Sequence, residues 1–282
     1  MKRAGFITYR DLPALTPDDR LAFAPLRELG IEAVPAVWDS DVDWKSFDSV
    51  VLRSCWDYHY RPEMFTRWLD HIEQIGLAIW NPARVVRWNM DKRYLGDLSR
   101  AGANIPRTIF VEKGASLLAV LEENRMEQAV IKPAISATAR RTWRTSFDTA
   151  RADQARLDEI LSQSAAVVQE FVEEVVTRGE WSIVFFGDYS HAVLKRAAKD
   201  DFRVQREFGG ASEALTPPQE IIQQAEDILR MVGDRIVYAR VDGVERGGRF
   251  MLLELELIEP ELFLRLDPDA PRRFAQSIAS AV

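Results

Sequence analysis

The sequence has 282 residues, 47% of them hydrophobic and 29% charged, which is typical of a folded globular protein with two or three compact units. Its formal net charge of −7 argues against general nucleic-acid binding, which requires a basic surface. The single cysteine, Cys55, excludes an internal disulfide, and no His/Cys spacing indicates a zinc site. Because the sequence has neither a signal-peptide pattern nor an apolar run of 18 residues, we expect a cytosolic protein that does not bind membranes.

The first 88 residues alternate between strand and helix patterns. Strands are predicted over residues 4–9, 31–38 and 49–54, and a helix is predicted to open near Thr16 and close at Gly30. Such alternation indicates a parallel sheet, whose ligands bind beyond the carboxyl ends of its strands. The stretch "RSCWDY" lies just past one of these ends.

Residues 89–167 predict a second unit. A helix capped by Asn89 or Asp91 is expected to end near Gly102, and Pro106 leads into a strand. A short strand over residues 129–133 is followed by a loop of small and basic residues and a helix over residues 148–162.

Residues 168–282 predict a mostly antiparallel sheet. Hairpin turns are expected at Gly187–Asp188 and Gly247–Gly248. Thr216 is predicted to cap a helix that has Pro217 at its first position and Gly233 past its end. The fold class is therefore α/β with an α+β C-terminal part.

The stretch "RFMLLELELIEPELFL" places two carboxylates on one face of a strand. Glu254 and Glu256 are two residues apart, and Asp242 on the preceding strand should lie within a residue or two of the position facing Glu254. Such a cluster suits a hard cation such as Mg²⁺, but an exposed acidic face explains these residues equally well.

Basic residues at element ends favour the cation site. Lys92, Lys132, Lys195, Arg196 and Arg203 all precede the acidic strand. Point charges for phosphates together with carboxylates for a metal are what a magnesium-bound nucleoside triphosphate requires.

These motifs occur in a recognisable order: "DK", "VIKP", "VQEFVEE…GE", "DFR…GG", "RVDG" and "LELELIEP". From residue 89 to the C-terminus the chain resembles the ATP-grasp superfamily, in its glutathione-synthetase-like and ribosomal-protein glutamyl-ligase-like branch. The stretches "VVLRSCWDYH" and "LELELIEPELFLRLDP" resemble more closely the sub-branch that includes the cycloserine-forming cyclo-ligase. The resemblance implies an N-terminal α/β domain (residues 1–88), a central lid domain (89–167) and a C-terminal domain with the metal site (168–282).

The resemblance also implies residue roles. Lys92 and Lys132 match the lysines on the ATP phosphates, and either Glu180 or Glu174 matches the acid on the ribose. Arg203 matches the arginine on the acyl phosphate, with Lys195 as a lesser candidate. The remaining matches are the adenine hinge, Gln169, Glu170, Phe171 and Val172, and the magnesium ligands, Asp242, Glu254 and Glu256, where a second glutamate favours two ions.

The expected reaction joins a small-molecule carboxylate to an amine through an acyl phosphate, with ATP and Mg²⁺. A two-substrate ligase, an intramolecular cyclo-ligase and a nucleotide-binding protein without turnover remain as alternatives. Substrate contacts are expected from Arg53 as a carboxylate clamp and from Glu259 at the amine. Trp56, Asp57 and Tyr58 are expected to line a substrate pocket, the alternative being that they plug the end of the sheet. His59 is expected at the surface or in packing, the alternative being a substrate contact.

One departure from the superfamily concerns the loop after Lys132. Residues 134–144 contain no glycine, whereas backbone amides that approach phosphate closely usually need glycine. Ser136, Thr138, Arg140 and Arg141 are the alternative donors in this loop, unless its arginines are merely solvated.

Overall fold

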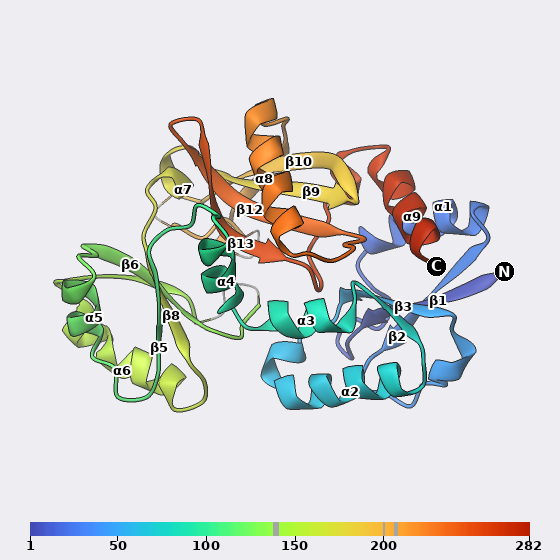
Figure 1. Cartoon of the computed structure of the whole chain (residues 1–282), viewed down its shortest axis with the longest axis horizontal. Coiled ribbons are helices and arrows are strands. Elements are labelled where there is room, and N and C mark those ends of the chain that lie inside the picture. The colour runs from blue at the N-terminus through green and yellow to red at the C-terminus, as the bar shows by residue number, and fades with distance from the viewer. Residues whose placement is uncertain (138–140, 200, 206–207) are drawn as a thin grey trace.

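The computed structural model describes residues 1–282 except 138–140, 200 and 206–207. Its described strands form three sheets, which lie in separate parts of the molecule (Figure 1). The N-terminal sheet has the order β2-β1-β3-β4, with all neighbours parallel as predicted. Its strands are β1 (Lys2–Thr8), β2 (Ile31–Val37), β3 (Ser49–Ser54) and β4 (Ala78–Trp80).

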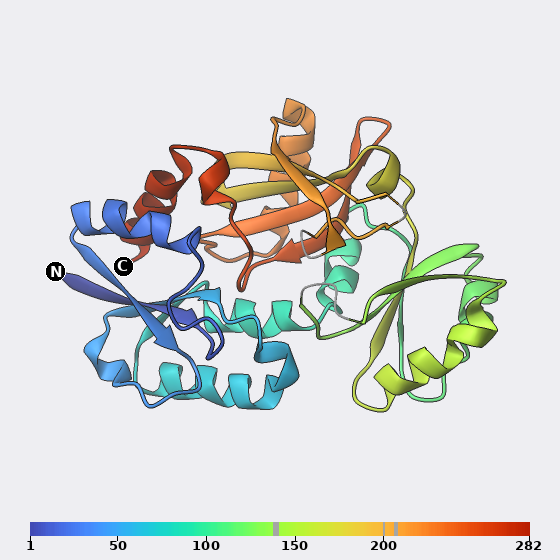
Figure 2. The same cartoon turned by 180° about the vertical axis from the view of Figure 1, so that it is seen from behind.

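Helices cover this sheet on both sides. One layer contains the 3-10 helix η1 (Asp19–Ala22), α1 (Phe23–Glu28) and the C-terminal helix α9 (Ala270–Ala281), and α1 and α9 lie side by side (Figure 2). The other contains α2 (Pro62–Gln74), whose apolar face packs under Trp38 and Leu52. Short 3-10 turns lie at η2 (Trp44–Ser46), η3 (Tyr58–Tyr60) and η5 (Leu264–Leu266). The C-terminus therefore returns to complete the N-terminal core.

The central sheet is antiparallel, in the order β5-β8-β6-β7. Its strands are β5 (Thr108–Val111), β6 (Gln128–Pro133), β7 (Trp143–Ser146) and β8 (Ala166–Glu170). Helices α5 (Leu117–Glu123) and α6 (Ala150–Leu161) share one buried cluster with Ile131 and Val168. The boundary placed after residue 167 falls inside β8.

The C-terminal sheet is antiparallel, in the order β11-β10-β9-β12-β13. Its strands are β9 (Glu180–Phe186), β10 (Asp188–Arg196), β11 (Ala211–Ala214), β12 (Ala239–Arg246) and β13 (Arg249–Glu256), with the short helix α7 (Glu174–Thr177) before β9. Gly247 and Gly248 both have positive φ in the β12–β13 turn, so the predicted hairpin is confirmed. Asp242 pairs directly with Glu254 in the register.

Side chains complete the outer edge of β13. The Asn89 amide donates to Leu255 O at 2.8 Å and accepts from Leu257 N at 2.9 Å, much as a neighbouring strand would. The Tyr94 hydroxyl accepts from Leu255 N at 2.9 Å. Helices α3 (Ala83–Met90) and α4 (Tyr94–Arg100) thereby fix the strand that carries Glu254 and Glu256.

Three predicted helices differ in detail from those of the structure. Asn89 belongs to the end of α3 and caps nothing, and Asp91 lies between two helices where one was expected. Thr216 and Pro217 precede α8 (Gln219–Met231), which starts after Pro218 without a side-chain cap. The predicted helix from Thr16 is split into η1 and α1. No described helix is long and apolar enough to cross a bilayer.

Candidate functional site

A cavity of about 540 Å³ is lined by residues from all three sheets and their loops. Trp56 and Tyr58 come from beyond β3, Lys132 and Gln169 from the central sheet, and Glu254 from β13. It lies at the carboxyl end of β3, where the parallel sheet predicted a ligand. The cavity holds most of the residues that the sequence singled out.

Arg240 also lines this cavity, although its sequence pattern alone was not taken to indicate a site. Its guanidinium donates to both oxygens of Asp242, with Nε at 2.9 Å from Oδ1 and Nη2 at 2.9 Å from Oδ2, and it also pairs with Glu256. Arg240 and Asp242 are two residues apart on β12, so they share a face. That spacing was a usable signal in "YARVDG".

Lys195 completes the cluster from β10. Its Nζ lies 2.5 Å from Glu180 Oε1 and 3.1 Å from Asp242 Oδ2, and Ser182 donates to Asp242 Oδ1 at 2.7 Å. Burial raises the pKa of Asp242, but Arg240 and Lys195 outweigh it and lower this pKa to about 2. Asp242 is therefore ionised at any physiological pH.

The two lysines expected at phosphates both line the cavity. Lys92 Nζ is 3.1 Å from Glu254 Oε1 and donates to Ser136 O at 2.9 Å, whereas Lys132 Nζ is 3.3 Å from Gln169 Oε1. Burial lowers the pKa of Lys132, although Glu254 partly offsets this. An anion in the cavity would stabilise the charged form of Lys132.

The hinge between the central and C-terminal sheets also faces the cavity. Gln169, Glu170, Phe171 and Val172 all line it. Of the two ribose candidates, Glu180 lies at the cavity wall beside Lys195, whereas Glu174 pairs with Arg246 at 2.7 Å and is not part of the lining. Of these two acids, only Glu180 therefore lies where a ligand in the cavity could contact it.

Arg203 lines the cavity, in the loop before β11. It pairs with Asp201 at 2.8 Å and lies over the Phe208 ring, 3.6 Å from its centroid. From the glycine-free loop, Ser136 reaches the cavity, but Arg141 turns to Glu159 at 2.6 Å and Gln163 at 3.0 Å. Thr138 and Arg140 lie outside the described residues.

The three predicted magnesium ligands have suitable chemistry, because all offer carboxylate oxygens at the same end of the β12–β13 hairpin. Burial, with Asp242 and Glu254 adding to it, raises the pKa of Glu256 to about 7 in spite of Arg240. A cation would relieve this excess of negative charge. Within the described part of the chain, no three acidic, His or Cys side chains are grouped as metal ligands. The three carboxylates pair instead with Arg240, Lys195 and Lys92.

The part of the cavity where a substrate was expected is lined by Trp56, Tyr58 and Glu259. Burial raises the pKa of Glu259 to about 8, and the nearby Glu256 adds to this effect. His59 lies instead at a second cavity, beside Tyr60.

The structure does not support the expected role of Arg53 as a carboxylate clamp. It is 1% exposed and absent from the cavity lining, because its guanidinium is held by Asp19 at 2.9 Å and by Pro260 O at 2.7 Å. Asp57 also lies outside the lining, where it pairs with Arg61 and accepts from Trp38. Both side chains are committed to the protein rather than to a ligand.

A family model and a related protein sequence both match this chain, and both point to the same family. Residues 4–81 match the family described as the N-terminal domain of the D-cycloserine synthetase DcsG. The cycloserine biosynthesis protein DcsG of Streptomyces lavendulae is 32% identical in an alignment of 274 positions that covers 90% of this chain and 90% of that protein.

Solved structures agree with this. A crystal structure of the D-cycloserine synthetase DcsG superposes with a TM-score of 0.89 at 28% identity and covers 99% of both chains. The D-alanine–D-alanine ligase of Bacillus anthracis with ATP gives 0.71 at 17% identity, covering 99% of this chain and 97% of that one. An ATP-grasp RimK domain protein of Sphaerobacter thermophilus gives 0.74 at 16%, covering 98% of both.

Proposed function

The chain belongs to the family of the D-cycloserine synthetase DcsG and is an ATP-grasp ligase that forms amide bonds, and we propose that it closes the amide within one small amino-acid-like substrate. The observation that carries this proposal is that the match extends through residues 4–81, which supply Trp56 and Tyr58 to the substrate end of the cavity. A ligase that shared only the ATP site would not need this similarity.

ATP-grasp ligases use ATP and Mg²⁺, and the cavity offers a place for each part of the nucleotide. The proposal puts adenine against residues 169–172, the ribose at Glu180 and the phosphates at Lys92 and Lys132. Magnesium would be held by Glu254 and Glu256, with Asp242 as the third ligand, and would offset charge on the phosphates. The additional negative charge of a second glutamate, Glu256, would favour two ions rather than one.

Arg240, Lys195 and Arg203 are proposed to act on the reacting groups. The substrate carboxylate oxygen takes the γ-phosphoryl group of ATP, and ADP leaves. The amine nitrogen then attacks the acyl carbon, phosphate departs, and the nitrogen loses a proton. Fixed guanidinium and ammonium groups in a largely buried site stabilise the negative charge that develops at these oxygens.

Release of ADP with a panel of candidates tests the proposal. The central compound is the aminooxy amino acid that results when the ring amide of cycloserine is opened. Turnover with this compound alone, accompanied by a cyclic product in mass spectrometry, supports ring closure.

Other outcomes contradict it. Turnover only when a carboxylate and a separate amine are both present identifies a two-substrate ligase. ATP binding without turnover for any compound contradicts the proposed reaction altogether.

A further inference from the structure

The loop after β13 is held by its backbone to an unusual degree. Successive carbonyl oxygens of residues 259 to 262 each accept a hydrogen bond from a side chain at 2.7 to 3.1 Å: in order, from Trp56, Arg53, Arg240 and His191. A loop usually satisfies its carbonyls with water or its own turns. Here other parts of the protein fix its path.

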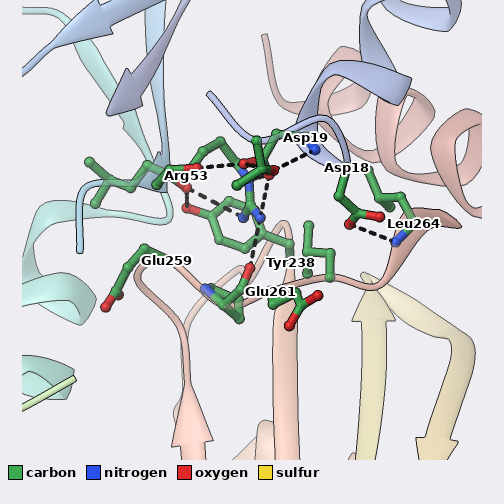
Figure 3. Close-up of polar contacts among 12 residues, drawn as sticks. Asp18, Asp19, Arg53, Tyr238, Glu259, Glu261 and Leu264 are labelled. Carbon is green, nitrogen blue, oxygen red and sulfur yellow. Dashed lines mark hydrogen bonds and ion pairs between the residues drawn. The ribbon is translucent and has the colours of Figure 1, made fainter. Parts of the chain in front are cut away.

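Arg53 is the central anchor of this loop (Figure 3). Its Nη2 donates to Pro260 O at 2.7 Å, its Nε donates to Asp19 Oδ1 at 2.9 Å, and its guanidinium lies 5.2 Å from the Tyr238 ring centroid. The other Asp19 oxygen accepts from Ser54 at 2.5 Å and from Thr16 at 2.8 Å. Both partners are buried, so neither can leave without a large desolvation cost.

Asp18, the residue next to Asp19, fixes the far end of the same loop. Its carboxylate accepts from Leu264 N and from Arg265 N, both at 2.9 Å. Between these two anchors Phe263 adopts a left-handed backbone conformation, with φ 51°. Two neighbouring acids at the start of η1 therefore hold the loop: Asp19 holds its first half through Arg53, and Asp18 holds its second half directly.

These hydrogen bonds to the loop determine where the Glu259 side chain points. With Pro260 O tied to Arg53 and Glu259 O tied to Trp56, the Glu259 side chain turns away from the Arg53 cluster (Figure 3) and lines the cavity beside Trp56 and Tyr58. We propose that the Arg53–Asp19 pair is a positioning device that sets loop 258–265 for substrate, an inference that rests on the proposed function. The N-terminal domain thus acts on the substrate end through the backbone of this loop.

Arg53→Lys tests the device. A lysine keeps the charge beside Asp19 but lacks the planar fork that reaches Asp19 and Pro260 O together. We expect amides of residues 258–265 to exchange hydrogen at least about tenfold faster, ADP affinity by calorimetry to stay within about twofold, and kcat/KM for the substrate to fall about tenfold or more with KM for ATP unchanged.

Arg3→Lys is the matched control, because Arg3 also combines a carboxylate (Glu32), a carbonyl (Ser46 O) and an aromatic ring (Phe47) in the same domain, away from the loop. It should leave loop exchange unchanged. Unchanged exchange of loop 258–265 in Arg53→Lys would overturn the proposal, as would a loss of ADP affinity with faster exchange across the whole N-terminal domain. If the wild type turns over no compound, the proposed function fails, and the exchange result still decides the role of Arg53.

Discussion

Arg53 and Arg240 are both buried arginines that pair with aspartate, but their surroundings differ. Asp19 receives donors from Arg53, Ser54 and Thr16 and lies outside the cavity lining. Arg240 instead faces the cavity and shares its charge between Asp242 and Glu256. The Asp19 carboxylate is fully satisfied by donors of the protein, whereas Arg240 has to serve two carboxylates.

This difference indicates where a ligand is needed. Around Arg240 the pKa of Glu256 is raised to about 7, by burial and by neighbouring acids, whereas in the Arg53 network both oxygens of Asp19 accept hydrogen bonds from protein donors. Surplus charge that the protein does not neutralise is typical of a site that binds ions. Buried charge alone does not identify such a site, since Arg53 is the more buried of the two arginines.

Glu254→Gln should give the largest effect on the open network. The change removes a proposed magnesium ligand but keeps the shape of the side chain, so we expect magnesium-dependent ATP turnover to fall by about 10³-fold or more with little change in melting temperature. ADP release at several magnesium concentrations measures it. Glu245→Gln, on the same hairpin but outside the cavity, is the control, and full activity of Glu254→Gln would refute the metal assignment.

Arg240→Lys should lower kcat by about 10²-fold, because lysine cannot bridge Asp242 and Glu256 or present a fixed fork to a developing oxyanion. Single-turnover kinetics with the substrate identified for the wild type measures the loss. If the variant instead lost only thermal stability, with normal activity per folded molecule, Arg240 would resemble Arg53 and the contrast between the two networks would disappear.

Lys132→Ala should weaken ATP binding about tenfold or more, since it removes a positive charge from the proposed phosphate site. Calorimetry with ATP and Mg²⁺ measures the affinity. Lys45→Ala, an exposed position in the N-terminal domain, should bind as the wild type does. Equal affinity in both variants would argue against the phosphate role.

Much of the site could be read from the sequence because its signals are local. The alternation in "LELELIE" placed Glu254 and Glu256 on one face, and the glycine turn set the hairpin that brings Asp242 opposite Glu254. The parallel N-terminal sheet followed from its alternating elements, as did the position of Trp56 past β3.

The contacts that sequence could not give are long-range. Arg53 follows a strand as a ligand-binding arginine would, and only the folded chain shows that Asp19 and Pro260, 34 and 207 residues away, already occupy it. Asn89 looked like a helix cap because nothing local reveals the β13 edge that takes up its amide. Arg240 differs from these two, because its signal was local: it lies two residues before Asp242 on β12 and therefore shares the face of that carboxylate.

Glu259→Gln should give the smallest effect, which we expect in the free energy of unfolding. The folded-state pKa of Glu259 is raised to about 8 from an ordinary value of 4.5. Between these two values the unfolded chain has ionised this carboxyl while the folded chain retains its proton, so the native residue destabilises the ligand-free protein increasingly as pH rises from about 4.5 to 8. At about 1.4 kcal/mol per pKa unit, reduced for partial solvent access, Glu259→Gln should raise the free energy of unfolding by about 1 to 3 kcal/mol at pH 8 and by almost nothing at pH 4. Urea unfolding at both pH values measures this, with Glu261→Gln in the same loop as control. If Glu259→Gln raised the free energy of unfolding by the same amount at both pH values, the carboxyl of Glu259 would not have the buried position in the cavity that the Arg53–Pro260 hydrogen bond gives it.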